Sequence, residues 1–138
     1  YPFFFLSKTL EKDQFKYYRY LNETRTNRNW NQWINFFLES CIKQANDNIK
    51  TLNRIDELYQ RDKALLMRKH NHFQIENFLE VLYQYPIISA NHLSNLSGIN
   101  YQTARQYINT LVKNRVLFPD QKKRNTKYYH YDIIQNLR

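Results

Sequence analysis

The residues best suited to bind a partner form a polar series that follows Gly98, the single glycine of the chain. Their spacing of three and four residues is typical of side chains that share one face of a helix. Arg can hold guanine with two hydrogen bonds, Gln or Asn can do the same for adenine, and hydroxyls near a helix start suit phosphates. The series therefore predicts a DNA-reading helix whose candidate contacts are Tyr101, Gln102, Thr103, Arg105, Gln106 and Asn109.

A cluster of bases follows this helix at Lys122, Lys123, Arg124 and Lys127. Such a cluster can neutralise backbone phosphates or enter a minor groove, and its contribution falls as salt rises. The formal net charge of +9 also favours acidic partners. Because the candidate helix itself is not very basic, docking of a protein partner, with the charges merely solvated, stands beside double-stranded DNA as a second interpretation.

Cap and stop residues place these features in a module that we assign to residues 71–138. Pro86 ends one helix, Ser89 caps a short second helix that ends at Gly98, and Asn100 or Tyr101 begins the third. A short helix, a turn and another helix form a helix-turn-helix arrangement.

Residues 116–118 read as a strand, 119–126 as a charged loop and 127–131 as a returning strand. With this hairpin as a wing, the module resembles winged helix-turn-helix domains in general.

A second informative feature is the aromatic string from Tyr17 to Leu38. It predicts a helix that begins after Asp13 and ends near residues 24–27, a polar loop over 26–29, and a second helix from about residue 29. The apolar side chains at three-and-four spacing predict a bulky seam between helices. We interpret four of these aromatic residues as scaffold: Trp30, Trp33, Phe36 and Phe37.

With the preceding Pro2-Phe3-Phe4-Phe5-Leu6-Ser7, this string resembles the C-terminal part of the Fic fold, over about residues 1–70. The Fic family transfers AMP from ATP onto protein hydroxyls. The resemblance implies that Tyr18, Leu21 and Arg25 border the adenine pocket of an intact parent protein. An aromatic face beside an aliphatic side chain suits a purine, although both groups can equally belong to a core.

The Fic catalytic motif, His-Pro-Phe-x-Asp/Glu-Gly-Asn-Gly-x-x-Arg, does not occur in this sequence. That motif supplies the base, the Mg²⁺ ligand and the backbone amides that hold the phosphates. No catalytic residue is therefore assigned here. We expect the chain to be a C-terminal fragment, silent by itself, of a parent that binds ATP and Mg²⁺ and modifies a target protein.

From Ile42 to about Lys69 the apolar positions keep helical spacing, which predicts one long amphipathic helix. Its stripe indicates core packing or, as an alternative, a coiled-coil-like homodimer. Residues 68–72 then break the pattern and read as a linker. His70 and His72 in this linker are weak evidence for a metal site, and we expect them to be solvated.

Composition sets the broad class of the 138-residue chain. The sequence contains 12 Tyr and 9 Phe but only 1 Gly and 3 Pro, which favours long helices over a β-sandwich or barrel. No apolar run is long enough for a membrane span. The lone Cys41 favours a reducing compartment, the cytoplasm.

Together these features predict a mainly α protein: the helical C-terminal part of a Fic fold over 1–70, then a winged helix-turn-helix domain with a small β-hairpin wing. The predicted function is that of an adenylyltransferase fragment with a DNA- or protein-binding module. A DNA-binding transcriptional regulator with a helical dimerisation scaffold is the alternative.

Overall fold

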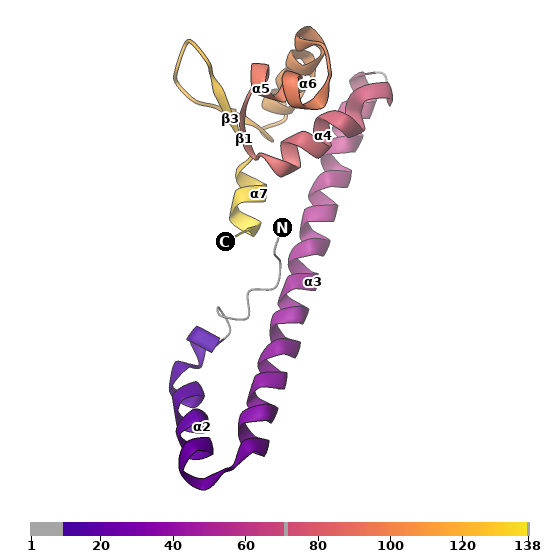
Figure 1. Cartoon of the computed structure of the whole chain (residues 1–138). Helices are drawn as coiled ribbons and strands as arrows, with labels where there is room; N and C mark the ends of the chain where they lie inside the picture. Colours follow the sequence, from indigo (N-terminus) through magenta and orange to yellow (C-terminus); the bar gives the residue numbers. More distant parts are fainter. Residues whose placement is uncertain (1–9, 71, 138) are drawn as a thin grey trace. The chain divides into compact units, whose positions relative to one another are not determined.

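The structure is a computed structural model that describes residues 10–70 and 72–137. It is mainly helical, as predicted, with one small antiparallel sheet (Figure 1). Residues 2–7, which contribute to the Fic resemblance, lie outside the described ranges. The elements are α2 (Gln14–Asn27), α3 (Trp30–Lys69), the 3-10 helix η1 (His72–Gln74), α4 (Ile75–Gln84), β1 (Ile87–Ser89), α5 (Ala90–Ser97), α6 (Tyr101–Lys113), β2 (Phe118–Pro119), β3 (Lys127–Tyr129) and α7 (Tyr131–Asn136).

The chain divides into two compact units, Tyr1–Leu52 and Asn53–Arg138. In the first unit, α2 and the first turns of α3 pack through aromatic rings. The rings of Tyr17 and Trp33 meet edge-on with centroids 5.5 Å apart, and those of Tyr20 and Phe36 lie 5.4 Å apart. Because these positions recur every three or four residues, one stripe of each helix forms the predicted seam.

The two helices are joined by Arg28 and Asn29 alone, so the predicted loop over 26–29 is shorter than expected. Arg28 ends α2 in the left-handed conformation, with φ of 53°. Trp33 and Phe36 belong to the packed seam, but the side chain of Trp30 is 58% exposed. The prediction that Trp30 is a packed scaffold residue is therefore wrong.

The second unit is built around α4, α5 and α6. Its core contains the fully buried side chains of Phe78, Leu93 and Ile108. Leu66, near the end of α3, is fully buried in the same cluster. The last turns of α3 therefore belong to this unit, whereas the sequence-based division assigned them, as part of residues 1–70, to the Fic-like part.

The predicted capping residues of the second unit cap their helices, whereas the side chain of Asp13, at the start of α2, makes no capping hydrogen bond. The Ser89 hydroxyl accepts a hydrogen bond from the His92 amide at the start of α5, and the Asn100 side chain accepts one from the Gln102 amide at the start of α6. Gly98 ends α5 with φ of 71°, a left-handed conformation that glycine adopts without strain.

The sheet has the strand order β1-β3-β2, with both pairs antiparallel. The hairpin of β2 and β3 was predicted, but β1 was not. Ile87 pairs with Tyr129 and Ser89 pairs with Lys127, so β1 adds a third strand beside β3. Three residues after a proline are too few to show the alternation that indicates a strand.

The strand predicted over 116–118 is shorter in the structure, because only Phe118 belongs to β2. Arg115 takes a left-handed conformation, with φ of 59°. The amides of Val116 and Leu117 then both donate to the carbonyl of Leu111 at the end of α6. These two residues are buried in the core, and their amides bond to the end of α6 instead of joining the sheet.

The strand predicted over 127–131 ends at Tyr129, because His130 caps α7. The prediction that His70 is a solvated linker residue is also wrong. Its Nε2 lies 2.7 Å from Thr110 Oγ1, and its ring meets that of Tyr107 with centroids 5.0 Å apart. The side chain of His72 lies outside the described part of the chain.

Candidate nucleic-acid interface

The predicted DNA-reading residues of α6 separate into two strips on the helix surface. Gln102, Gln106 and Asn109 are exposed and lie opposite the core, and we call them the outward strip. Tyr101 and Arg105, one turn apart and also exposed, lie to one side of it and form the flanking strip. Thr103, the remaining candidate of the helix, is half-buried on the other side of the outward strip.

The basic loop, residues 120–126 between β2 and β3, brings the second set of candidates to the same unit (Figure 1). None of its bases makes an ion pair within the described ranges, and the same holds for the following Lys127. The Asp120 carboxylate accepts a hydrogen bond from the Lys122 amide, which helps to order the loop. All four predicted basic contacts are exposed: Lys122, Lys123, Arg124 and Lys127.

A small notch of about 140 Å³ joins the flanking strip to the basic loop. Its charged lining residues are Arg105 and Lys123, and no Asp or Glu lines it. The structure thus brings Lys123 to the same notch as Tyr101 and Arg105, which lie 22 and 18 positions earlier in the sequence. The remaining lining residues are Ser89, Ala90, Asn91, Asn125, Thr126 and Tyr128.

Within the notch the guanidinium of Arg105 is oriented by a neighbouring ring. Its Nη1 donates to the hydroxyl of Tyr101 at 3.1 Å. This hydrogen bond, with the nearby Tyr101 and Tyr128 hydroxyls, raises the pKa of Arg105 above its ordinary value. Arg105 therefore presents a fixed positive charge at every physiological pH.

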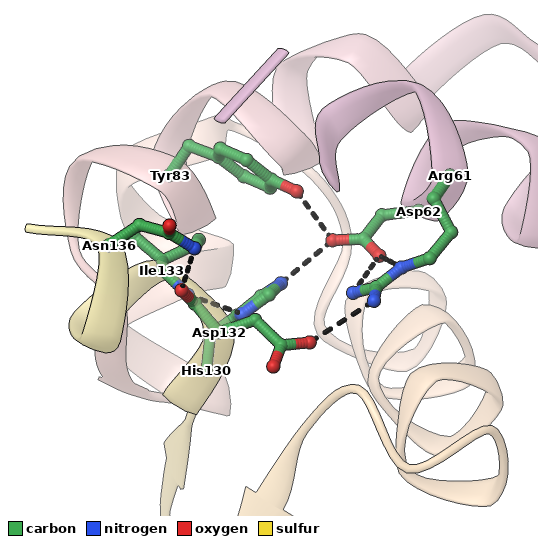
Figure 2. Close-up of polar contacts among 7 residues, drawn as sticks. All are labelled: Arg61, Asp62, Tyr83, His130, Asp132, Ile133 and Asn136. Atoms are coloured by element: carbon green, nitrogen blue, oxygen red, sulfur yellow. Dashed lines mark hydrogen bonds and ion pairs between the residues drawn. The ribbon is translucent and has the colours of Figure 1, made fainter. Parts of the chain in front are cut away.

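A buried network, Asp62 with Tyr83 and His130, fixes the sheet to the helices (Figure 2). The Tyr83 hydroxyl donates to Asp62 Oδ2 at 2.6 Å, and His130 Nε2 lies 2.7 Å from the same oxygen. His130 Nδ1 accepts the Ile133 amide at 3.4 Å, so the proton of the neutral ring is on Nε2 and is donated to Asp62. Burial and the Asp62 charge raise the pKa of Tyr83, which keeps its hydroxyl protonated.

Arg61 extends the network to the surface, with Nη2 2.9 Å from Asp62 Oδ1 and Nη1 3.1 Å from Asp132 Oδ2. A carboxylate hydrogen-bonded to a histidine and a tyrosine is an arrangement that also occurs in catalytic sites. Here, however, the side chains of Asp62 and His130 are both 0% exposed, so neither can touch a substrate. The network holds together α3, α4 and the segment that joins β3 to α7.

The predicted nucleotide residues lie on α2 in the other unit. Tyr18 is 59% exposed, Arg25 is exposed and Leu21 is half-buried, so Tyr18 and Arg25 are not core residues. A groove between α2 and α3 lies beside different side chains, among them Asp13, Lys16 and Tyr20. The structure therefore places the three residues on one side of α2 without gathering them around that groove.

Neither a metal site nor a membrane span is found among the described residues. Within residues 10–70 and 72–137, no three His, Cys, Asp or Glu side chains are grouped as a metal site would require. No helix in the same ranges combines the length and apolarity that a membrane span needs. No protein-family model matches the sequence, and no curated protein matches it.

Proposed function

We propose that the C-terminal unit is a winged helix-turn-helix module that binds double-stranded DNA, with α6 as the recognition helix and the basic loop as the wing. The observation that carries this proposal is the arrangement of α6 and the loop in one unit. The outward strip offers amide side chains that suit base edges, and the loop offers cations without acidic partners among the described residues.

The order of elements supports the same proposal. A helix, a short strand, two helices joined by a turn at Gly98 and a two-stranded hairpin follow one another from α4 to β3. The alternative is a protein-docking module whose bases are only solvated. Lys122, Lys123 and Arg124 have no acidic partner among the described residues, which leaves their charges available to neutralise backbone phosphates and favours DNA.

A mobility-shift experiment with charge-matched variants tests the DNA proposal. The wild-type chain should retard random duplex at about 50 mM salt and release it at about 200 mM. Changing the three loop bases to Gln should abolish the shift, whereas changing the exposed Lys50, Arg54 and Arg68 to Gln should leave most of it. Equal loss in both triple variants would show attraction by net charge alone, and no shift at low salt would remove the DNA proposal.

We also propose that the chain is the supporting part of a Fic-type protein adenylyltransferase, working in the cytoplasm, where a lone Cys41 stays reduced. Tyr18, Leu21 and Arg25 would border the adenine of ATP, and the base and the Mg²⁺ ligands would come from the parent's catalytic motif. The exposure of Tyr18 and Arg25 supports a contact role over a core role. No catalytic residue is assigned within this chain.

This second proposal predicts that the loss of the Tyr18 side chain affects ATP affinity but not stability. In a parent protein with the Fic motif, Tyr18→Ala should weaken ATP binding and leave the thermal midpoint near wild type. Phe15→Ala, which removes another exposed aromatic ring from α2, should change neither. A large loss of stability with unchanged ATP affinity would show that Tyr18 has a structural role in the parent and does not contact the nucleotide.

A further inference from the structure

The notch beside α6 separates Arg105 from the residues that face straight outward. On a helix with 3.6 residues per turn, positions 102, 106 and 109 cluster around one direction, and positions 101 and 105 are rotated toward one side. The lining of the notch shows that this side faces the basic loop, since Tyr101 and Arg105 share the notch with Lys123. Arg105 therefore does not stand in the same row as the amide side chains.

The notch has the chemistry of a phosphate site. Its two charges are both positive and come from α6 and from the loop, and no carboxylate lines it. Hydroxyl and amide groups of Ser89, Asn91 and Thr126 complete the polar wall. A notch of about 140 Å³ has room for a phosphate group.

We infer that Arg105 and Lys123 bind one backbone phosphate in this notch, so that Arg105 positions the module on the duplex and the outward strip alone reads bases. This inference rests on the proposed DNA-binding function. It changes the role predicted for Arg105, which by residue type suits guanine. It also predicts that the outward strip prefers adenine, because Gln and Asn side chains pair best with that base.

Binding a phosphate here also explains the hydrogen bond from Arg105 to Tyr101. A guanidinium held by the Tyr101 hydroxyl is turned along the side of α6 toward the notch. A guanine contact would need the same group to extend away from the helix into the groove. The tyrosine therefore orients Arg105 for the phosphate before DNA arrives.

Salt-dependent binding to a panel of duplexes, measured by fluorescence anisotropy, distinguishes the two roles of Arg105. If it holds a phosphate, Arg105→Ala weakens binding by the same factor for every duplex and reduces the slope of log affinity against log salt by about one. Lys123→Ala should behave in the same way. Gln106→Ala should instead reduce the preference for duplexes with adenine at the contacted position, by about 5- to 150-fold, with little change of slope.

The inference is overturned if Arg105→Ala removes discrimination between duplexes that carry or lack a guanine and leaves the salt slope unchanged. Because Arg105 is exposed and outside the core, its replacement should leave the fold intact, and amide spectra of the variant check this.

Titration with inorganic phosphate, followed by amide NMR, separates this inference from the DNA proposal. Saturable shifts at Asn91, Arg105 and Thr126 that disappear in Arg105→Ala would support the notch even if no duplex binds. Duplex binding without such shifts, and with a normal salt slope in Arg105→Ala, would refute the notch and leave the DNA proposal standing. If both ligands bind, added duplex should displace phosphate from the same amides.

Discussion

Replacing Asp62 by Ala tests whether the last turns of α3 are part of the C-terminal unit. Asp62 lies on α3 and its side chain is 0% exposed, yet its carboxylate accepts hydrogen bonds from Tyr83 of α4 and from His130, which precedes α7. The substitution removes the one acceptor that these donors share in the buried network. Removing a surface carboxylate from the same helix would break no buried hydrogen bond.

The expected loss follows from the burial of the donors. The Tyr83 hydroxyl and His130 Nε2 each lose a hydrogen bond to the buried carboxylate, and a hydrogen bond to a charged group is worth about 1.5–3 kcal/mol, so the predicted loss is about 3–6 kcal/mol. The contribution of Arg61 is discounted, since its side chain is 42% exposed and can return to water. At about 1.4 kcal/mol for each factor of ten, the predicted loss corresponds to a stability constant lowered by about 150- to 20,000-fold.

Hydrogen exchange of the α6 amides measures the loss of stability in the C-terminal unit, to which Asp62 belongs. Trp30 and Trp33 both belong to the first unit, so tryptophan fluorescence would report on the wrong part of the chain. Protection of Ala104 and Ile108, which are fully buried, should fall by the predicted factor in Asp62→Ala. Asp56→Ala, an exposed change on the same helix, should alter protection by less than about threefold. A loss below tenfold in Asp62→Ala would refute the structural role of the network.

Three further changes probe the local structure around the site. Gly98→Ala should cost about 1 kcal/mol, because a Cβ meets no atom within 4 Å there but the left-handed backbone is strained for alanine. Ser89→Ala should cost a similar amount through loss of the α5 cap. Burial and the charge of Lys69 lower the pKa of His70 below its ordinary value, so protonation of His70 favours the unfolded state. The contribution of His70 to stability should therefore be fully present above about pH 6.5 and be lost as the pH falls below it. The free energy of unfolding should fall more steeply with acid in the wild type than in His70→Gln.

Urea titrations of the full chain, followed by the same α6 amides, check these three changes. Gly98→Asn should be milder than Gly98→Ala, because asparagine tolerates the left-handed conformation. Identical costs for the two would contradict the backbone argument. For His70, equal pH profiles in the wild type and in His70→Gln would show that this histidine does not contribute to acid sensitivity.

Local signals in the sequence predicted the helices α4, α5 and α6 of the C-terminal unit correctly. Ser89, Gly98 and Asn100 each act through their own backbone or the nearest turn, so their residue types suffice to place the ends of α5 and α6. The exposed surface of α6 also follows from helical spacing. What could not be predicted is which side of α6 would face the basic loop, because that depends on the path of the chain through the sheet.

The buried network was missed because its members carry no joint pattern. His130 follows Asp62 by 68 positions, and each residue by itself suggests a solvated surface group. In the same way, β1 and α7 are too short for periodicity to reveal them, and their formation depends on pairing with β3 and on the His130 cap. Such features come from tertiary contacts, which override local preference.

Above all, we propose that α6 and the basic loop bind double-stranded DNA. Amide NMR of the isotope-labelled chain, titrated with random duplex at about 50 mM salt, tests it most directly. We expect shifts concentrated in residues 101–109 and 120–127, with little change in α2, and their loss as salt rises. An unchanged spectrum at low salt, or shifts confined to the first unit, would contradict it.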